Sequence, residues 1–312
     1  MRFSIHTGNH GSHNGLSDTV TFLKCALQDC GHDARIDTEL ASGRVNIVLE
    51  HFPDAAAVER IAQARAGGAR FVVVATEPMT GGTFNAGIAA GHSHYGNTAY
   101  WKQRYSGFVA AAAHAEAVWV LAESMVAPYQ ATLPGTPVLF LPHGWVSDFA
   151  RMRHRAEADK DIDVYSSGTL TDHRMKVFRA LGERGHRVVW DPLGVPDYLR
   201  FEHLSRAKVC MSLKLSATSE VPSVSRLHFL LEHACAIAHE RCAQTSPLDP
   251  YLLHLPGDEL IEWCEAMLTL PDRREIAEGA ATRFAAELPM SRLLPPILSA
   301  SLNGRVRHAV TA

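Results

Sequence analysis

Short apolar runs alternate with helix-like stretches along both halves of the chain, and this alternation constrains the fold more than any other feature. Residues 70–76 show almost no polar alternation, as expected for a parallel strand that is covered on both faces. A succession of strand, helix and strand is typical of a parallel, doubly wound sheet. In the first half we expect strands at 2–7, 44–50, 70–76, 117–121 and 138–141, and helices at 17–29, 55–66, 106–115 and 125–132.

The second half repeats the pattern after a charged break without apolar periodicity. Strands are expected at 163–167, 187–190, 208–213 and 236–239, and helices at 173–183, within 197–207, at 225–235, from 260, at 274–288 and at 291–302. A length of 312 residues also favours two domains, since a domain has about 150 residues. We therefore predict an α/β protein of two Rossmann-like, doubly wound domains that face a central cleft. The expected segments are a first domain at 1–146, a linker at 147–161, a second domain at 162–285, and a C-terminal helix in 286–312 that could pack back on the first domain.

The composition excludes several classes of protein. Thirty Lys and Arg against 33 Asp and Glu give a net charge of −3, without the overall basic charge of a nucleic-acid binder. The start of the chain lacks a secretory apolar segment, and the longest apolar run, 108–122, is too short to span a membrane. The six cysteines form no CxxC pair, and His92 and His94 lack a third ligand nearby. We expect a cytoplasmic protein without a membrane span, a disulfide framework or a bound metal.

The second half offers an anion site where its expected strands end. Gly168 and Thr169 join a strand to a helix, and a helix N-terminus there would favour a phosphate, with Arg174 adding charge. Ligands of doubly wound sheets bind at the carboxyl ends of the strands, and Lys214 follows the strand at 208–213. Gly168 could instead serve only a tight turn, Arg174 could be solvated, and Lys214 could be an ordinary surface lysine.

A second helix start in this half carries further candidates. Ser225 and Arg226 lie where a polar loop opens a helix, so they could meet a diphosphate at its first turn. Glu232 lies six residues after Arg226, and its carboxylate could bind ribose hydroxyls. The alternative for Glu232 is an ion pair with a cation on a helix face.

The first half carries candidate catalytic residues. The loop after the first strand has glycines at 8, 11 and 15, which is not the G-x-G-x-x-G pattern, so we expect no nicotinamide cofactor. His13 in this loop could act as a general base, with Asp18 to orient it. Glu77 follows the strand at 71–76 and could be a carboxylate of the cleft, or else a turn residue before Pro78.

Several stretches resemble a known family. The segments AEAVWVLAESMVAPYQATLPGTPVLFLPHGW, DIDVYSSGTLTDHRMKVFRALGERGHRVVW and EVPSVSRLHFLLEHACAIAHE are similar to parts of two-domain GT-B glycosyltransferases, in particular the spore-maturation-like bacterial enzymes. The resemblance covers about residues 116–265, and 1–115 fits only in general architecture. It implies that the second domain holds a nucleoside-diphosphate sugar, that the first holds an acceptor, and that transfer needs no cofactor or bound metal, because helix N-termini and basic side chains offset the leaving diphosphate.

The resemblance also assigns roles to single residues. It places the diphosphate contacts at Gly168, Lys214, Ser225 and Arg226, a ribose-binding acid at Glu232, and the base near Asp191. The acceptor, which could be a small molecule, a glycan, a protein or modified nucleic acid, stays open, as do the donor sugar and the oligomeric state.

Two other functions remain open from the sequence. A nucleotide-sugar epimerase of the same fold would use the same diphosphate site without an acceptor. A non-catalytic nucleotide-sugar-binding partner protein is the other, because Val224 stands where many retaining members carry the first of two paired glutamates. The segment 79–105, expected to be a long loop, contains four aromatic residues that could form a partly solvated core patch or else stack on a sugar or a nucleobase: Tyr95, Tyr100, Trp101 and Tyr105.

Overall fold

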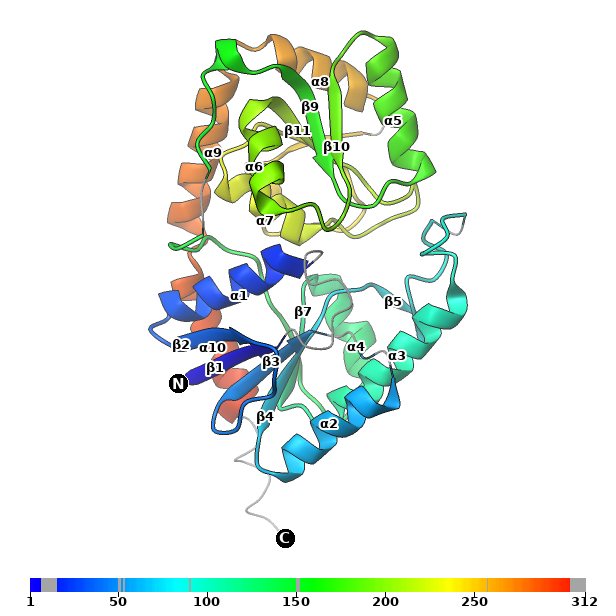
Figure 1. The fold of residues 1–312 in the computed structure, drawn as a ribbon, viewed down its shortest axis with the longest axis vertical. Helices are drawn as coiled ribbons and strands as arrows, with labels where there is room; N and C mark the ends of the chain where they lie inside the picture. Colours follow the sequence, from blue (N-terminus) through cyan, green and yellow to red (C-terminus); the bar gives the residue numbers. More distant parts are fainter. Residues whose placement is uncertain are drawn as a thin grey trace. The chain divides into compact units, whose positions relative to one another are not determined.

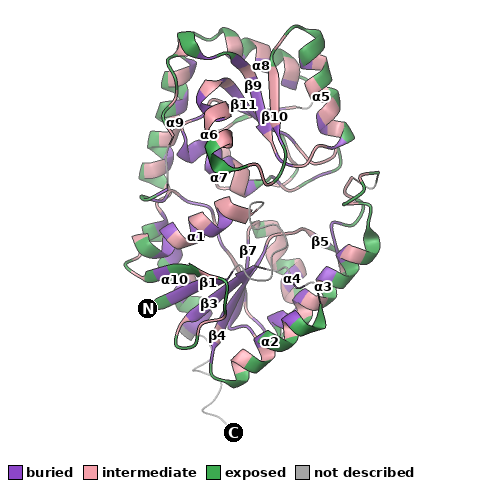
Figure 2. Ribbon diagram, in the orientation of Figure 1, coloured by how far each residue is buried: buried purple, intermediate pink, exposed green. Residues whose placement is uncertain are grey.

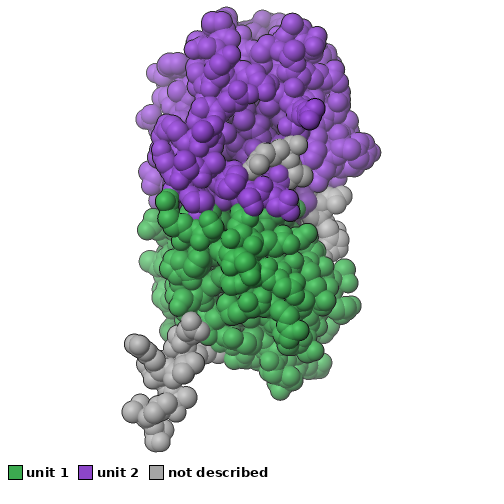
Figure 3. Space-filling model, turned by 90° about the vertical axis from the view of Figure 1, so that its left-hand side faces the viewer, with its two compact units in different colours: residues 1–13, 19–142, 290–312 green, residues 14–18, 143–289 purple. Residues whose placement is uncertain are grey.

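The computed structural model describes residues 1–6, 16–49, 52, 54–89, 91–149, 152–256 and 258–303. The chain divides into two compact units (Figure 3): unit 1 comprises 1–13, 19–142 and 290–312, and unit 2 comprises 14–18 and 143–289. Each unit has its own parallel sheet and its own helices (Figure 1), so the prediction of two doubly wound α/β units is confirmed.

Unit 1 is built on a six-stranded parallel sheet in the order β2-β1-β3-β4-β7-β8. Its strands are β1 Arg2–His6, β2 Asp33–Asp37, β3 Val45–Leu49, β4 Arg70–Ala75, β7 Ala117–Val120 and β8 Val138–Phe140. The helices are α1 Ser17–Asp29, α2 Ala55–Ala66, α3 Thr98–Ala112, α4 Val126–Thr132 and α10 Met290–Asn303. A short hairpin of β5 Met79–Thr80 and β6 Thr83–Phe84 follows β4, and a 3₁₀ turn, η2 Glu123–Met125, precedes α4. The central strands are buried on both faces (Figure 2), which explains their nearly continuous apolar sequences.

Helix α10 packs against the sheet of unit 1, although it comes more than 140 residues after the last strand of that sheet. The Trp119 indole on β7 donates to Ser301 Oγ at 2.8 Å, and Arg70 donates to the Leu302 carbonyl at 2.8 Å. Both bonds join residues more than 180 positions apart. The last helix is therefore part of the first unit.

Unit 2 has a five-stranded parallel sheet in the order β10-β9-β11-β12-β13. Its strands are β9 Ile162–Ser167, β10 Val188–Asp191, β11 Ala207–Ser212, β12 Ile237–Glu240 and β13 Leu253–Leu255. The helices are α5 Asp172–Glu183, α6 Asp197–Arg206, α7 Val224–Glu232, α8 Leu260–Thr269 and α9 Arg273–Glu287, with 3₁₀ turns η3 Glu157–Asp159 and η4 Asp249–Tyr251. From β9 the chain goes first to β10 on one side and then to β11 on the other, so the topological switch point lies between β9 and β11.

The structure differs from the sequence-based expectations in one predicted loop and in two strands that were not predicted. The long loop expected at 79–105 contains the β5–β6 hairpin and the start of α3, which begins at Thr98 rather than 106. Asn97 caps this helix by accepting from the Tyr100 N–H at 3.1 Å, and Trp101 and Arg104 are buried one turn apart. Strands β2 and β13 were missed, β2 because a charged, largely exposed edge strand lacks an apolar pattern and β13 because it has three residues.

In the described part of the chain no helix is long and apolar enough to cross a membrane.

Candidate functional site

The carboxyl ends of β9 and β11 form the candidate site, which lies within unit 2. The loop after β9 leads into α5, and the loop after β11 leads into α7, so two helix N-termini begin at this edge of the sheet. Thr171 caps α5, with its hydroxyl 3.4 Å from the Arg174 N–H, and donates to the Leu215 carbonyl at 2.7 Å. A switch point with two helix starts is where an anion binds in folds of this kind.

Gly168 lets a guanidinium approach the backbone. Its φ of +103° lies in the region that favours glycine, and its N–H donates to the Asp191 carbonyl at 2.8 Å. A Cβ at this position would overlap the guanidinium of Arg226 and would lie 3.4 Å from Nη1 of Arg174. The structure therefore brings Gly168, Arg174 and Arg226 together, from the end of β9 and the first turns of α5 and α7.

Arg174 holds the two loops against each other. The residue is 4% exposed, and its Nη1 donates to the Thr169 carbonyl at 2.7 Å. Its Nη2 and Nε donate to the carbonyls of Leu213 and Lys214 at 2.9 and 3.0 Å. Arg174 is thus buried, and the alternative of a solvated helix residue is wrong. The bonds fix the distance between the loops after β9 and β11.

Glu240 is a residue of this edge that sequence reasoning missed. It ends β12 and is 3% exposed. Its Oε2 accepts from the backbone N–H of Lys214 at 2.9 Å, and both of its carboxylate oxygens lie 3.0 Å from Nε2 of His173. The carboxylate thereby ties β12 to the loop after β11 and to the first turn of α5. A signal was present, since Glu240 directly follows the strand expected at 236–239.

Ser225 lies in the first turn of α7 next to Arg226. Its Oγ is 3.3 Å from Nε2 of His143, a residue that is 3% exposed. Burial holds the pKa of His143 well below its ordinary value, so this imidazole is neutral at pH 7. Ser225 thus shares the first turn of α7 with Arg226, and the imidazole beside its hydroxyl, that of His143, carries no charge.

Glu232 lies at the opposite end of α7 from Arg226. Six residues of helix separate the two, which is about 9 Å along the axis. The Glu232 Oε1 accepts from the Val146 N–H at 2.8 Å and lies 3.4 Å from Nε2 of His228, and its side chain is fully buried. The structure does not bring Glu232 together with Gly168 and Arg226, because a helix that starts at the carboxyl edge of the sheet runs away from that edge.

Asp191 ends β10 beside the loop of Gly168. Its carboxylate accepts from the Tyr165 hydroxyl at 3.0 Å and contacts Nδ1 of His203 at 2.9 Å, and the residue is 4% exposed. Burial and the charge of Asp191 raise the pKa of Tyr165, so the phenol stays protonated and donates. Asp191 therefore supports the edge from inside the sheet.

The structure shows separate surroundings for Asp18 and Glu77, two of the three candidate catalytic residues of the first half. His13 lies outside the described residues. Asp18, counted with unit 2, accepts two hydrogen bonds from Arg200 of the same unit at 2.6 and 2.9 Å. Glu77 in unit 1 accepts from Nδ2 of Asn85 at 2.9 Å, and its other oxygen lies 3.1 Å from Nη1 of Arg104. The Glu77 carboxylate is thus held in one orientation by two donors.

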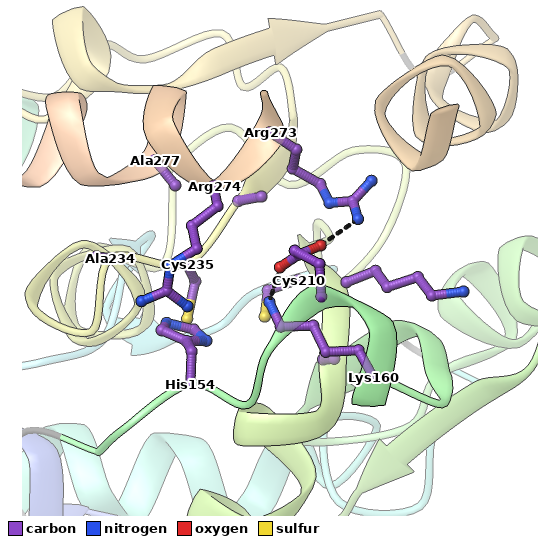
Figure 4. A pocket seen from close by; sticks show the side chains of 12 residues that line it. His154, Lys160, Cys210, Ala234, Cys235, Arg273, Arg274 and Ala277 are labelled. Carbon is purple, nitrogen blue, oxygen red and sulfur yellow. Dashed lines mark hydrogen bonds and ion pairs between the residues drawn. The ribbon is translucent and has the colours of Figure 1, made fainter. Parts of the chain in front are cut away.

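A polar pocket of unit 2 lies at the amino ends of its strands (Figure 4), and it is closed by its own ion pairs. Lys160 Nζ lies 2.6 Å from Glu157 Oε1, and Arg273 pairs with the other oxygen of the same carboxylate. The remaining space of about 10 Å³ holds at most one water. Across the described ranges, no cluster of three His, Cys, Asp or Glu side chains could hold a metal ion. The carboxyl edge is the better candidate for a ligand.

Comparisons with known proteins bear on the fold. No protein-family profile matches the chain, and no curated protein matches it. A solved structure of a mutant of S. aureus TarM with fondaparinux, α-GlcNAc-glycerol and UDP is similar at a TM-score of 0.53 and 10% identity, over 85% of this chain and 56% of TarM. A second TarM structure matches at a TM-score of 0.49 and 12% identity, with the same two coverages. The N-terminal domain of Candida albicans trehalose-6-phosphate phosphatase matches at 0.48 and 10%, over 84% of this chain and 72% of that one.

The likeness at a TM-score above 0.5 shows the fold, and this chain spans a little over half the length of TarM. The resemblance inferred from the sequence is confirmed at that level: the chain has the GT-B fold, with two Rossmann-like α/β units.

Proposed function

We propose that the chain is a glycosyltransferase that takes a nucleoside-diphosphate sugar at the carboxyl edge of the unit 2 sheet and transfers the sugar to an acceptor hydroxyl. The observation that carries the proposal is the approach of Arg226 to Gly168, between the N-termini of α5 and α7. A guanidinium over a glycine turn, at the start of a helix, is suited to a diphosphate.

Each residue of the edge has a role in this proposal. Arg226 and Lys214 supply positive charge to the diphosphate. Ser225, in the first turn of α7, and Thr169, in the loop after β9, lie beside it. Arg174 and Glu240 act as positioning residues, since their side chains bond the loops themselves. Asp191 supports the Gly168 loop, while Glu232 has a structural role at the far end of α7.

The transfer balances without a cofactor. The bond between the sugar C1 and the diphosphate oxygen breaks, a bond forms between C1 and the acceptor oxygen, and the acceptor proton passes to a base. The departing nucleoside diphosphate keeps the electron pair, and the basic side chains and helix N-termini stabilise its charge. His13 and Glu77 remain the predicted candidates for the base, with Asp18 engaged by Arg200.

Isothermal titration with UDP, GDP, ADP, CDP and dTDP, in the presence of a chelator, tests the donor site. UDP comes first because it is present in the TarM structure. We expect one nucleotide to bind, and Arg226→Ala to weaken binding by about tenfold or more, the effect of losing a hydrogen bond to a charged group. Arg179→Ala removes an exposed arginine on α5 and is the matched control. The absence of nucleotide binding, or equal binding by the Arg226→Ala variant, would contradict the proposal.

A turnover assay separates transfer from the two alternatives. The chain is incubated with the sugar nucleotide of the tightest-binding base, with and without an acceptor panel, and products are resolved by mass spectrometry. A glycosylated acceptor supports transfer. Isomerisation of the sugar without acceptor would indicate an epimerase, and tight binding without any turnover would indicate a non-catalytic binding protein.

A further inference from the structure

Unit 1 has an unusual crossover between two of its parallel strands. Strands β2 and β3 both pair with β1 in parallel, one on each side. The chain must therefore return from the carboxyl end of β2 to the amino end of β3 between them. Residues 38–44 make this return in seven residues without a helix. A helix of that length would span about 10 Å, whereas a strand of five residues is about 16 Å long, so only a nearly extended chain can cover the distance.

The crossover is held to the sheet by one buried side chain. Asn46 on β3 is fully buried, accepts from the Ala41 N–H at 2.7 Å and donates to the Ala41 carbonyl at 3.0 Å. Leu40 packs against the core cluster that contains Val48. The side chains of β1 from Phe3 onward and of β3 are buried, so the space beside the crossover lies at the carboxyl end of β1, between residues 38–40 and α2. A cavity of about 450 Å³ lies there.

The cavity combines a buried imidazole with charged and polar side chains. Its lining comprises His6, Thr38, Glu39, Leu40, Arg60, Gln63 and Ala64, all in unit 1. His6 ends β1 and is 5% exposed, and within the described residues its Nδ1 has no hydrogen-bond partner. The carboxylate beside it in register, Asp37, is already bonded by Ser4 and Arg35 at 2.6 Å each. A buried imidazole nitrogen without a hydrogen-bond partner is costly unless a ligand meets it.

We propose that this cavity is a binding site for a hydroxylated molecule of monosaccharide size that carries one anionic group. The volume lies within the range of small-molecule sites, about 300–1,000 Å³. The Arg60 guanidinium would meet a phosphate or a carboxylate. Glu39, Gln63 and Thr38 supply carboxylate, amide and hydroxyl groups for ligand hydroxyls, and His6 supplies a ring nitrogen at the buried end. The site is separate in sequence from the residues proposed to hold a nucleotide and does not depend on them.

The test uses the whole chain and three probes in isothermal titration. Glucose 6-phosphate and glucuronate carry the two anionic groups, and glucose carries neither. We expect saturable binding of at least one anionic probe, and binding of glucose at least about tenfold weaker, because glucose cannot form the charge-assisted hydrogen bond to Arg60. Tighter binding of glucose 6-phosphate or of glucuronate identifies the anionic group.

Three variants locate the binding. Arg60→Ala should weaken it by about tenfold or more, whereas Lys102→Ala, which removes an exposed cation on α3, should not change it. Ala64→Leu, which projects a larger side chain into the cavity from α2, should weaken binding while circular dichroism shows an unchanged fold. Arg226→Ala should bind the probe as the unaltered chain does. The proposal is overturned if neither anionic probe binds, if glucose binds equally well, if Arg60→Ala and Ala64→Leu bind normally, or if Arg226→Ala loses binding.

Discussion

The substitution Gly168→Ala examines the candidate site most sharply, because one added methyl group has two separable effects. The first is backbone strain at φ +103°, which costs about 1–3 kcal/mol for a residue other than glycine. The second is displacement of Arg226, whose guanidinium the new Cβ would overlap. Loss of one charged hydrogen bond to a diphosphate costs about 1.5–3 kcal/mol, which raises the Kd by about tenfold to 150-fold.

Gly185→Ala is the matched control for the strain. Gly185 also lies in unit 2, with φ +90°, and a Cβ there would meet nothing within 4 Å. Both variants should lose stability in urea denaturation, but only Gly168→Ala should lose nucleotide affinity in isothermal titration. The reasoning is refuted if Gly168→Ala binds the nucleotide like the unaltered chain, or if Gly185→Ala loses as much affinity.

Two further predictions concern the stability of unit 2. Glu240→Gln should destabilise it by about 1–3 kcal/mol in urea denaturation, because the amide keeps one acceptor oxygen but turns its NH2 group toward the Lys214 N–H or toward Nε2 of His173; an unchanged midpoint would contradict this role. Burial lowers the pKa of His239 from 6.5 to about 4, so the unfolded chain binds more protons between these values, and stability should fall by about 3 kcal/mol from this group as the pH drops from 6.5 to 4. His239→Gln should flatten that pH dependence, and an equally steep fall in the variant would count against the assignment.

The fold was accessible from the sequence because its central strands are buried on both faces. Apolar runs such as 70–75 and 117–120 mark such strands whatever their neighbours are. The edge strand β2 lacks that signal, since its charged side chains face solvent or one another. The early start of α3 was also hidden, because its first turn is identified by the Asn97 cap rather than by apolar spacing.

The candidate site was only partly accessible. Gly168 and Arg226 were found because each stands at a junction between a strand and a helix. Burial of Arg174 could not be predicted, since its partners are backbone carbonyls about 40 residues away. Glu232 was grouped with Arg226 by sequence distance, although six residues of helix carry it away from the edge. The hollow beside His6 depends on the path of a loop, which local sequence patterns do not specify.

Hydrogen–deuterium exchange with the tightest-binding nucleoside diphosphate tests the central claim most directly, because it reports where the ligand lies. The account predicts slower exchange at 168–174 and 213–226, the loops and helix starts at the carboxyl ends of β9 and β11. Protection confined to other segments, or none at saturating nucleotide, would contradict a diphosphate site built on Gly168 and Arg226.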